Sequence, residues 1–310
     1  MKTDVKFVTS GNIQIAGSLH SPDSEKARRL PAIVVSHPGS GVKEQTASLY
    51  ANRLAEAGFI ALAFDCAYQG ESGGEPRGLE DPAQRVEDIK AAVSYLETRP
   101  DVDSEHTALL GICASGGYSI AATVSDHRIE AVATVSGVDM ALQFRRGADG
   151  NQAPAVFENL LDAAAKARTA EALGEGVQRF PLFPGSEGEA RTGGQHLFEG
   201  WEYYRTSRAQ HPRSMKAMTW NSVDKMAIFD AFRFIDLVSP RPLLFILGSK
   251  AVTKWMGIEA FERAKEPKEL MWIDGASHVD LYDKPEYVDL AVAKLSDFFH
   301  NASANSTSLC

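Results

Sequence analysis

The chain has 310 residues, of which 44% are hydrophobic and 24% are charged. These values are typical of a globular protein, and the length allows one large α/β domain with an insertion or two ordinary domains. The formal net charge of −9 argues against an electrostatic nucleic-acid surface. The N-terminus has no apolar signal-peptide core and no stretch approaches a membrane-spanning length, so we expect a cytoplasmic protein without nucleic-acid or membrane partners.

Cysteine usage agrees with this expectation. Cys66, Cys113 and Cys310 lie far apart and match no metal-ligand spacing, so we expect neither a metal nor another cofactor. An odd, sparse count fits a reducing compartment. The last residues, 301–310, are rich in Asn and Ser, and we expect a disordered tail there.

Strand and helix patterns alternate along the first 139 residues. A hairpin is predicted from Val5–Val8 and Ile13–His20, with its turn at residues 10–12. Further strands are predicted at 32–36, 59–64, 107–112 and 131–135, and helices at 45–57, 82–96 and 114–125. This alternation predicts an α/β fold with a mostly parallel, doubly wound sheet.

The alternation stops after Asp139 and resumes at Leu243. Between them no clear strand is predicted, and helical patterns occur at 155–173, 201–205 and 226–234. The final strands are predicted at 243–247 and 270–273, and the final helices at about 258–264 and 285–299. We therefore predict an α/β core from residues 1–139 and 236–300. Residues 140–235 are predicted to be a helical cap over the sheet edge where open α/β folds bind ligands.

The segment Thr107–Tyr118, T-A-L-L-G-I-C-A-S-G-G-Y, has the strand–turn–helix context of a nucleophile elbow. In the pattern G-x-Nu-x-G, Gly111 is the first glycine, Cys113 the nucleophile, and Ser115 takes the second glycine's place. A second register would make Ser115 the nucleophile, but it lengthens the strand and leaves Gly111 without a purpose. We favour Cys113; an inert buried cysteine is the alternative.

A Gly-rich loop follows the strand at 32–36, where hydrolases with such an elbow supply one N–H group of the oxyanion hole. The backbone N–H of Gly39 is the first candidate and that of Ser40 the second. The other N–H comes from Ala114, the residue after the nucleophile. His37 is expected to shape the pocket, and the loop Asp65–Ser72 to brace the nucleophile's neighbourhood.

The candidate base is His278, in a Gly-rich turn after the last predicted strand. Its place near the end of the chain fits the order nucleophile, acid, histidine. The acid usually follows the strand at 243–247, but residues 248–254 hold no carboxylate. Asp139 is the alternative acid, or it only caps the next segment. A Cys–His pair needs the acid less than Ser–His, because a thiol ionises readily and a neighbouring imidazolium lowers its pKa further.

Three aromatic residues are candidates for substrate binding. Trp201 and Tyr204 of the predicted cap, together with Tyr68 of the bracing loop, are expected to wall an apolar acyl chain. Packing of the cap aromatics into the cap's own core is equally open.

These residues resemble the α/β-hydrolase superfamily from Val5 to about Phe299, with 140–235 most divergent. The motifs H-P-G-S-G-V-K-E-Q, D-x-x-x-Q-G-E-S-G-G-E-P-R, D-P-x-x-R-V-E-D-I and G-I-C-A-S-G-G are similar to a dienelactone-hydrolase-like branch that includes fungal polyketide transferases and thiohydrolases. The resemblance implies an α/β-hydrolase fold and acyl chemistry. In members of the branch that keep the acid, we would look for it at about Val252.

The expected reaction forms an acyl-thioester on Cys113 with His278 as base. The donor is a small-molecule activated ester or thioester, free or carrier-bound. The acceptor is water, an alcohol or a stabilised carbanion, which gives a thioesterase, an acyltransferase or a Claisen-type condensing enzyme on polyketide-like chains. A plain esterase, a ligand-binding protein on a decayed hydrolase scaffold and a homodimer all remain open.

Overall fold

A computed structural model of the chain describes residues 1–23 and 29–306. Its main sheet has eight strands in the order β1-β2-β4-β3-β5-β6-β9-β10. The strands are β1 (Lys2–Val8), β2 (Gln14–His20), β3 (Leu30–Ser36), β4 (Ile60–Phe64), β5 (Val102–Ile112), β6 (Ile129–Val135), β9 (Leu243–Gly248) and β10 (Lys268–Ile273). β2 pairs antiparallel with β1 and β4, and every pairing from β4 to β10 is parallel. The predicted α/β class with a mostly parallel sheet is confirmed.

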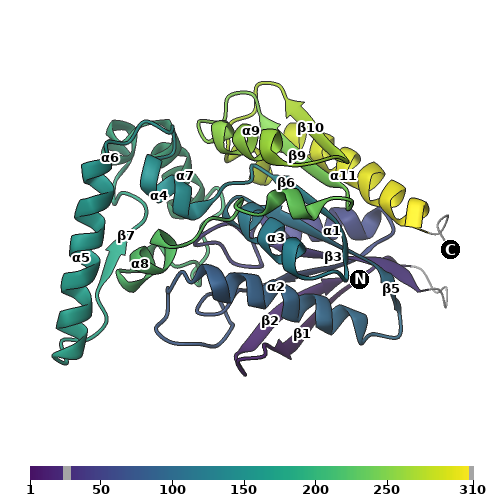
Figure 1. Cartoon of the computed structure of the whole chain (residues 1–310), viewed down its shortest axis with the longest axis horizontal. Helices are drawn as coiled ribbons and strands as arrows, with labels where there is room; N and C mark the ends of the chain where they lie inside the picture. Colours follow the sequence, from purple (N-terminus) through teal and green to yellow (C-terminus); the bar gives the residue numbers. More distant parts are fainter. Residues whose placement is uncertain (24–28, 307–310) are drawn as a thin grey trace.

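Helices cover both faces of this sheet (Figure 1). One apolar cluster contains side chains of α1 (Thr46–Glu56) and α11 (Pro285–Ser306), and a second contains those of α2 (Pro82–Glu97), α3 (Ala114–Ser125) and α9 (Lys254–Arg263). Successive residues of one strand belong to opposite clusters: Leu109 packs with α2 and α3, and Leu110 with α1 and α11. Burial on both faces explains why the central strands are continuous apolar runs.

The chain leaves the sheet after β6 and forms the segment 140–235, which we call the cap segment. It contains α4 (Met140–Arg146), α5 (Pro154–Ala172), β7 (Arg179–Pro181), α6 (Glu187–Thr192), α7 (Gln195–Arg205), β8 (Ala217–Thr219) and α8 (Asn221–Ala227). In Figure 1 these elements lie to one side of the main sheet, with α5 outermost. The 3-10 helix Ile235–Val238 then packs against α3 and leads the chain back to β9.

Two details of the cap segment differ from the sequence prediction. Two short strands, β7 and β8, pair antiparallel where no strand was expected. The helix predicted at 226–234 is wrong, because α8 ends at Ala227. The N–H group of Ala231 donates to the carboxylate of Asp139 (3.0 Å), and that of Phe232 donates to the carboxylate of Asp230 (3.1 Å). These side-chain bonds compete with the backbone bonds that a helix would need there.

The C-terminal helix is longer than expected. α11 continues through residues 301–306, so the predicted disordered tail is wrong there, and residues 307–310 lie outside the described residues. Ala302, which belongs to α11, is buried in the apolar cluster that this helix shares with α1. Ser303 Oγ donates to the Phe299 carbonyl (3.1 Å). No helix in the described part of the chain, α11 included, has the length and apolarity needed to cross a membrane.

Backbone atoms pack closely at the turn between β5 and α3. A Cβ on Gly111 would lie 2.2 Å from the Ser115 carbonyl oxygen, and a Cβ on Gly116 would lie 2.5 Å from Gly137 Cα. Both neighbours are backbone atoms, which cannot rotate away. The small residues of the motif therefore let the strand, the helix and the following loop come into direct contact.

We expect Gly111→Ala to lower the free energy of unfolding by roughly 2–3 kcal/mol, because the new methyl group forces the elbow apart. The measurement is urea unfolding of both proteins. The control is Gly188→Ala in α6, where a Cβ meets nothing within 4 Å and the change should be neutral or slightly stabilising. Equal stability of the two variants would contradict this account of the turn.

Candidate active site

Cys113 occupies the turn between β5 and α3 with φ 56° and ψ −121°. A residue with a side chain is strained in such a conformation, at a cost of about 1–3 kcal/mol. Three backbone hydrogen bonds hold it. Its N–H donates to the Val135 carbonyl (3.0 Å), and its own carbonyl accepts from the N–H groups of Gly116 (2.8 Å) and Val138 (3.0 Å). The thiol is thereby presented to a cavity at the N-terminus of α3.

The alternative nucleophile, Ser115, lies below this turn. Its side chain is fully buried, and its Oγ donates to the His37 carbonyl (2.5 Å) and accepts from Ser36 Oγ (2.8 Å). Both hydrogen bonds tie α3 to the end of β3. The structure therefore places Cys113 against the cavity and uses Ser115 to join two core elements.

Two backbone N–H groups converge on the thiol. Those of Gly39 and Ala114 lie near enough to the sulfur of Cys113 to lower the pKa of the thiol. Gly39 is held in turn by its carbonyl, which accepts from the Tyr204 hydroxyl (3.2 Å). Ser40 also lines the cavity, but its backbone has turned to φ 61° and its carbonyl accepts from Ser214 Oγ (2.7 Å). Of the two loop candidates, Gly39 has the geometry of an oxyanion donor.

His278 lies in the loop after β10, with both ring nitrogens paired to hydroxyl groups. Nδ1 lies 2.5 Å from Thr253 Oγ1, and Nε2 lies 2.9 Å from the Tyr282 hydroxyl. Burial lowers the pKa of His278 well below its usual range, and the nearby His196 lowers it further. The imidazole is therefore neutral at pH 7.

The prediction that Asp139 orients His278 is wrong. Asp139 Oδ1 accepts from the N–H groups of Ala141 (2.8 Å) and Leu142 (3.3 Å), and Oδ2 accepts from that of Ala231 (3.0 Å). The carboxylate caps the N-terminus of α4, whose unpaired N–H groups are strong local donors. Thr253 occupies the orienting position, one residue beyond the place where the family resemblance would put an acid.

The resting site is uncharged. Burial raises the pKa of the Cys113 thiol, and hydrogen bonds from the Tyr282 hydroxyl and from the N–H groups of Ala114 and Gly39 only partly offset it. A neutral thiol therefore faces a neutral imidazole, and the expectation that an imidazolium lowers the thiol pKa is wrong for the free protein. The Tyr282 hydroxyl bonds to His278 and also lies near enough to the thiol to lower the pKa of Cys113, so it stands between the two groups.

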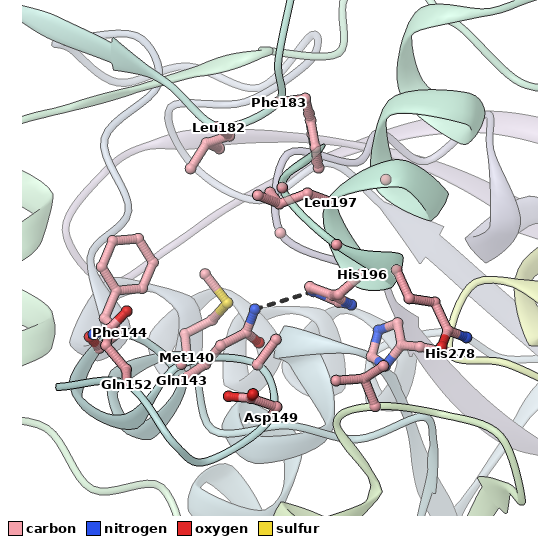
Figure 2. Close-up of a pocket in the computed structure, with 18 of the residues that line it drawn as sticks. Met140, Gln143, Phe144, Asp149, Gln152, Leu182, Phe183, His196, Leu197 and His278 are labelled. Atoms are coloured by element: carbon pink, nitrogen blue, oxygen red, sulfur yellow. Dashed lines mark hydrogen bonds between the residues drawn. The ribbon is translucent and has the colours of Figure 1, made fainter. Parts of the chain in front are cut away.

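The cavity has a volume of about 820 Å³ and lies between the carboxyl edge of the sheet and the cap segment. Its base holds Cys113, His278 and Tyr282. Apolar side chains make most of its walls, among them Met140, Phe144, Leu182, Phe183 and Leu197, which surround the opening in Figure 2. Among its described lining residues there is no Lys or Arg, and Asp149 is the single carboxylate.

Of the three predicted wall residues, only Tyr204 lines this cavity. Its ring is stacked on that of Phe183, with centroids 4.7 Å apart. Trp201 stacks instead on Phe198 in the same helix, with centroids 6.1 Å apart. Tyr68, at φ 69°, packs beneath Gly74 in its own loop. The substrate-binding assignments of Trp201 and Tyr68 are therefore wrong, because local packing uses both rings.

His37 is a brace rather than a reactive group. Its Nδ1–H donates to the Pro38 carbonyl (2.7 Å), and its Nε2 accepts from the Cys66 N–H (3.1 Å). Burial, helped by the positive charge of Arg85, lowers its pKa to about 3. A neutral His37 thus fixes the loop that carries Gly39 to the loop after β4.

One acidic cluster in the described chain has the spacing of a metal site. Oxygens of Glu44, Asp65 and Glu71 lie within 4.8 Å of one another. Lys43 Nζ is bonded to all three, at 2.8, 3.0 and 2.5 Å. Its ammonium group occupies the position that a cation would need, so the cluster serves to anchor the bracing loop to the residues after β3.

Four further residues of the site were not predicted from the sequence. Thr253 and Tyr282 bond to His278, and Gln143 and His196 lie on the cap side of the cavity. Tyr282 follows His278 by four residues, a spacing that places two side chains on one side of a helical turn. That spacing could have identified Tyr282 from the sequence. The other three belong to no motif.

Comparisons with known proteins agree with this architecture. Residues 15–178, just over half of the chain, match the dienelactone hydrolase family. The uncharacterized protein YcjY of Escherichia coli is 39% identical over 96% of this chain and 98% of its own length. The crystal structure of the hypothetical protein PA2218 from Pseudomonas aeruginosa, 33% identical, superimposes with a TM-score of 0.90 and covers 97% of this chain and 94% of its own. The polyketide transferase grgF of a Penicillium species is 25% identical over 90% of both chains.

We expect Thr253→Val to lower kcat about 10- to 100-fold with little change in KM. The substitution removes the hydroxyl that pairs with Nδ1, and a hydrogen bond to a charged imidazole contributes about 1.5–3 kcal/mol. Thr253→Ser keeps the hydroxyl and should restore most of the rate. Asp139→Asn is the contrasting variant: it keeps one acceptor for the cap but places an amide NH2 group, a donor, where Oδ2 accepts from the Ala231 N–H. It should lower the free energy of unfolding by about 1–2 kcal/mol while kcat stays within a few-fold. A larger kcat loss in Asp139→Asn than in Thr253→Val would reverse the assignment.

Proposed function

Because the chain belongs to the dienelactone hydrolase family, we propose that it is an acyl-transfer enzyme in which Cys113 carries the acyl group. The observation behind this proposal is the placement of one thiol. It lies on a strained elbow, bonded to two N–H groups and linked through a tyrosine to a histidine, at the base of an apolar cavity.

The first step is ionisation of the thiol. The Cys113 S–H bond breaks and its proton goes to the Tyr282 oxygen, while the Tyr282 O–H proton passes to Nε2 of His278. The products are a thiolate and an imidazolium, and Tyr282 ends the step unchanged. Thr253 Oγ1 accepts from the Nδ1–H throughout, which keeps Nε2 free to take the proton.

The second step is acylation. The thiolate attacks the acyl carbonyl, and the resulting oxyanion takes hydrogen bonds from the N–H groups of Gly39 and Ala114. The bond to the leaving group then breaks, and the proton held by His278 goes to the leaving oxygen or sulfur. An acceptor that gives its proton back to His278 finally displaces Cys113 from the acyl carbon.

The cavity favours a neutral, mainly apolar acyl donor. Its walls are aliphatic and aromatic, and no described lining residue is a Lys or Arg that could balance a carboxylate. A thioester or enol ester suits a thiol nucleophile, because attack then does not have to expel a poor leaving group. A cap that excludes water slows hydrolysis of the acyl-enzyme, which favours transfer to an alcohol or a carbon acid. The likeness to a polyketide transferase supports transfer onto polyketide-like chains as the fuller form of the proposal.

We expect an acyl adduct on Cys113 when the protein is mixed with a panel of acyl thioesters. The measurement is intact mass followed by peptide mapping. Cys113→Ala should form no adduct, whereas Ser115→Ala should still form one, because its hydroxyl only bonds core groups. His278→Ala should acylate at least about 100-fold more slowly, since the thiol loses its base.

Partitioning of that adduct separates the candidate reactions. A transfer product with an added alcohol or carbon acid supports an acyltransferase, and free acid alone supports a thioesterase or plain esterase. An adduct that forms on Ser115 in the wild type, or equal adduct levels in wild type and Cys113→Ala, would refute the proposal. Binding of acyl ligands without any adduct would favour a non-catalytic carrier.

We expect Tyr282→Phe to lower kcat about 100-fold or more, because the proton path between thiol and imidazole loses its middle member. The same variant should shift the pH midpoint of Cys113 alkylation upward, since the thiolate loses a donor. The matched control is Tyr203→Phe, a buried ring that packs edge-on against Tyr282 (5.2 Å) without bonding His278. A Tyr282→Phe enzyme with normal kcat and an unshifted alkylation profile would exclude the relay.

A further inference from the structure

The cap segment places one polar pair on the otherwise apolar wall of the cavity. Gln143 comes from α4 and His196 from α7, and Gln143 Nε2 lies 3.1 Å from His196 Nε2. Figure 2 shows the two joined between Met140 and His278. The ring centroids of His196 and His278 are 5.1 Å apart, so the pair lies beside the catalytic histidine.

Each member of the pair keeps one buried atom without a partner. These atoms are Gln143 Oε1 and His196 Nδ1. Burial lowers the pKa of His196 to about 4, so its ring is neutral at pH 7. With the Gln143 amide donating to Nε2, the ring proton is on Nδ1. The pair therefore offers one free acceptor and one free donor, and flipping the amide only exchanges which residue offers which.

An unpaired donor and acceptor in an apolar wall cost free energy that a matching ligand group recovers. A hydroxyl group both donates and accepts, so it can pair with both atoms, whereas a ketone oxygen only accepts. A negatively charged group fits less well, because His196 is neutral and no described residue of the cavity wall is a Lys or Arg that could balance the charge.

The position of the pair indicates which part of a ligand reaches it. Met140, Gln143 and Phe144 are spaced i, i+3 and i+4 on α4, so they share one face of that helix. An acyl chain that packs on Met140 and Phe144 therefore passes Gln143. Because His196 lies against His278, the atoms that meet the pair are those near the reacting carbonyl.

We propose that Gln143 and His196 form a subsite for a hydroxyl group on the acyl chain, within a few carbons of the reacting carbonyl. The proposal rests on the acyl-transfer function given above and specifies its substrate class as hydroxyacyl thioesters. The hydroxyl donates to the free acceptor of the pair and accepts from the free donor.

The test compares kcat/KM for the N-acetylcysteamine thioesters of hexanoate, 3-hydroxyhexanoate and 5-hydroxyhexanoate. The wild type should prefer one hydroxyacyl thioester over hexanoyl by about tenfold or more. Gln143→Leu should reduce that preference to within about threefold while turnover of the hexanoyl thioester persists. Gln143→Met is a second variant of similar length in case the first folds poorly. Met140→Leu, on the same helix face, is the control and should keep the preference.

A wild type without preference for either hydroxyacyl thioester overturns the proposal, as does a preference that survives both Gln143 variants. A Gln143 variant that changes only the choice of acceptor also overturns it. Calorimetric binding of the same thioesters to Cys113→Ala separates this inference from the proposed function. In one outcome the wild type turns over no thioester, yet Cys113→Ala binds a hydroxyacyl thioester more tightly than the hexanoyl thioester. If adding Gln143→Leu to Cys113→Ala removes that difference in binding, the subsite stands and the catalytic proposal fails. Equal binding of all three thioesters refutes the subsite.

Discussion

The strained backbone of Cys113 is the constraint on which the rest of the site depends. Hydrogen bonds to Val135, Gly116 and Val138 hold its φ at 56° and turn the thiol away from the sheet. The same turn directs the N–H of Ala114 toward the sulfur. Because strand, helix and loop meet here backbone to backbone, Gly111 has no room for a side chain. The strain is offset by packing of the whole core, so the geometry exists before any substrate binds.

Burial then decides the electrostatics. It raises the pKa of Cys113 and lowers that of His278, and a neutral hydroxyl from Thr253 stands where a carboxylate would stabilise an imidazolium. The resting thiol is therefore protonated and weakly reactive toward oxidants and alkylating agents. In the proposed reaction, ionisation is favoured only when a carbonyl is present to take the electron pair and the N–H groups of Gly39 and Ala114 are there to hold the charge. If Cys113 is the nucleophile, as proposed, its reactivity then depends on a bound substrate.

The carboxylate that was predicted to orient His278 anchors the cap segment instead. Asp139 caps the first turn of α4 with one oxygen and holds Ala231, near the other end of the segment, with the second. It thereby ties the two ends of the cap segment together at the carboxyl end of β6. The helix that Asp139 caps, α4, presents Met140, Gln143 and Phe144 to the cavity. The carboxylate of Asp139 thus both attaches the cap segment to the core and caps the helix that supplies part of the cavity wall.

Local patterns in the sequence were enough to determine the alternating fold, the elbow with Cys113, the loop with Gly39 and the place of His278. Apolar periodicity and the requirement for small residues at a tight turn act over a few neighbouring residues, so they are visible without coordinates. The partners of His278, the role of Asp139 and the pair formed by Gln143 and His196 were decided only by the tertiary structure. Gln143 and His196 are 53 residues apart and Thr253 and His278 are 25 apart, and neutral hydroxyl and amide groups carry no sequence signature. Asp139 was misassigned for the same physical reason: a carboxylate beside a helix N-terminus bonds to the nearest free N–H groups, and which groups are nearest depends on how the chain folds back.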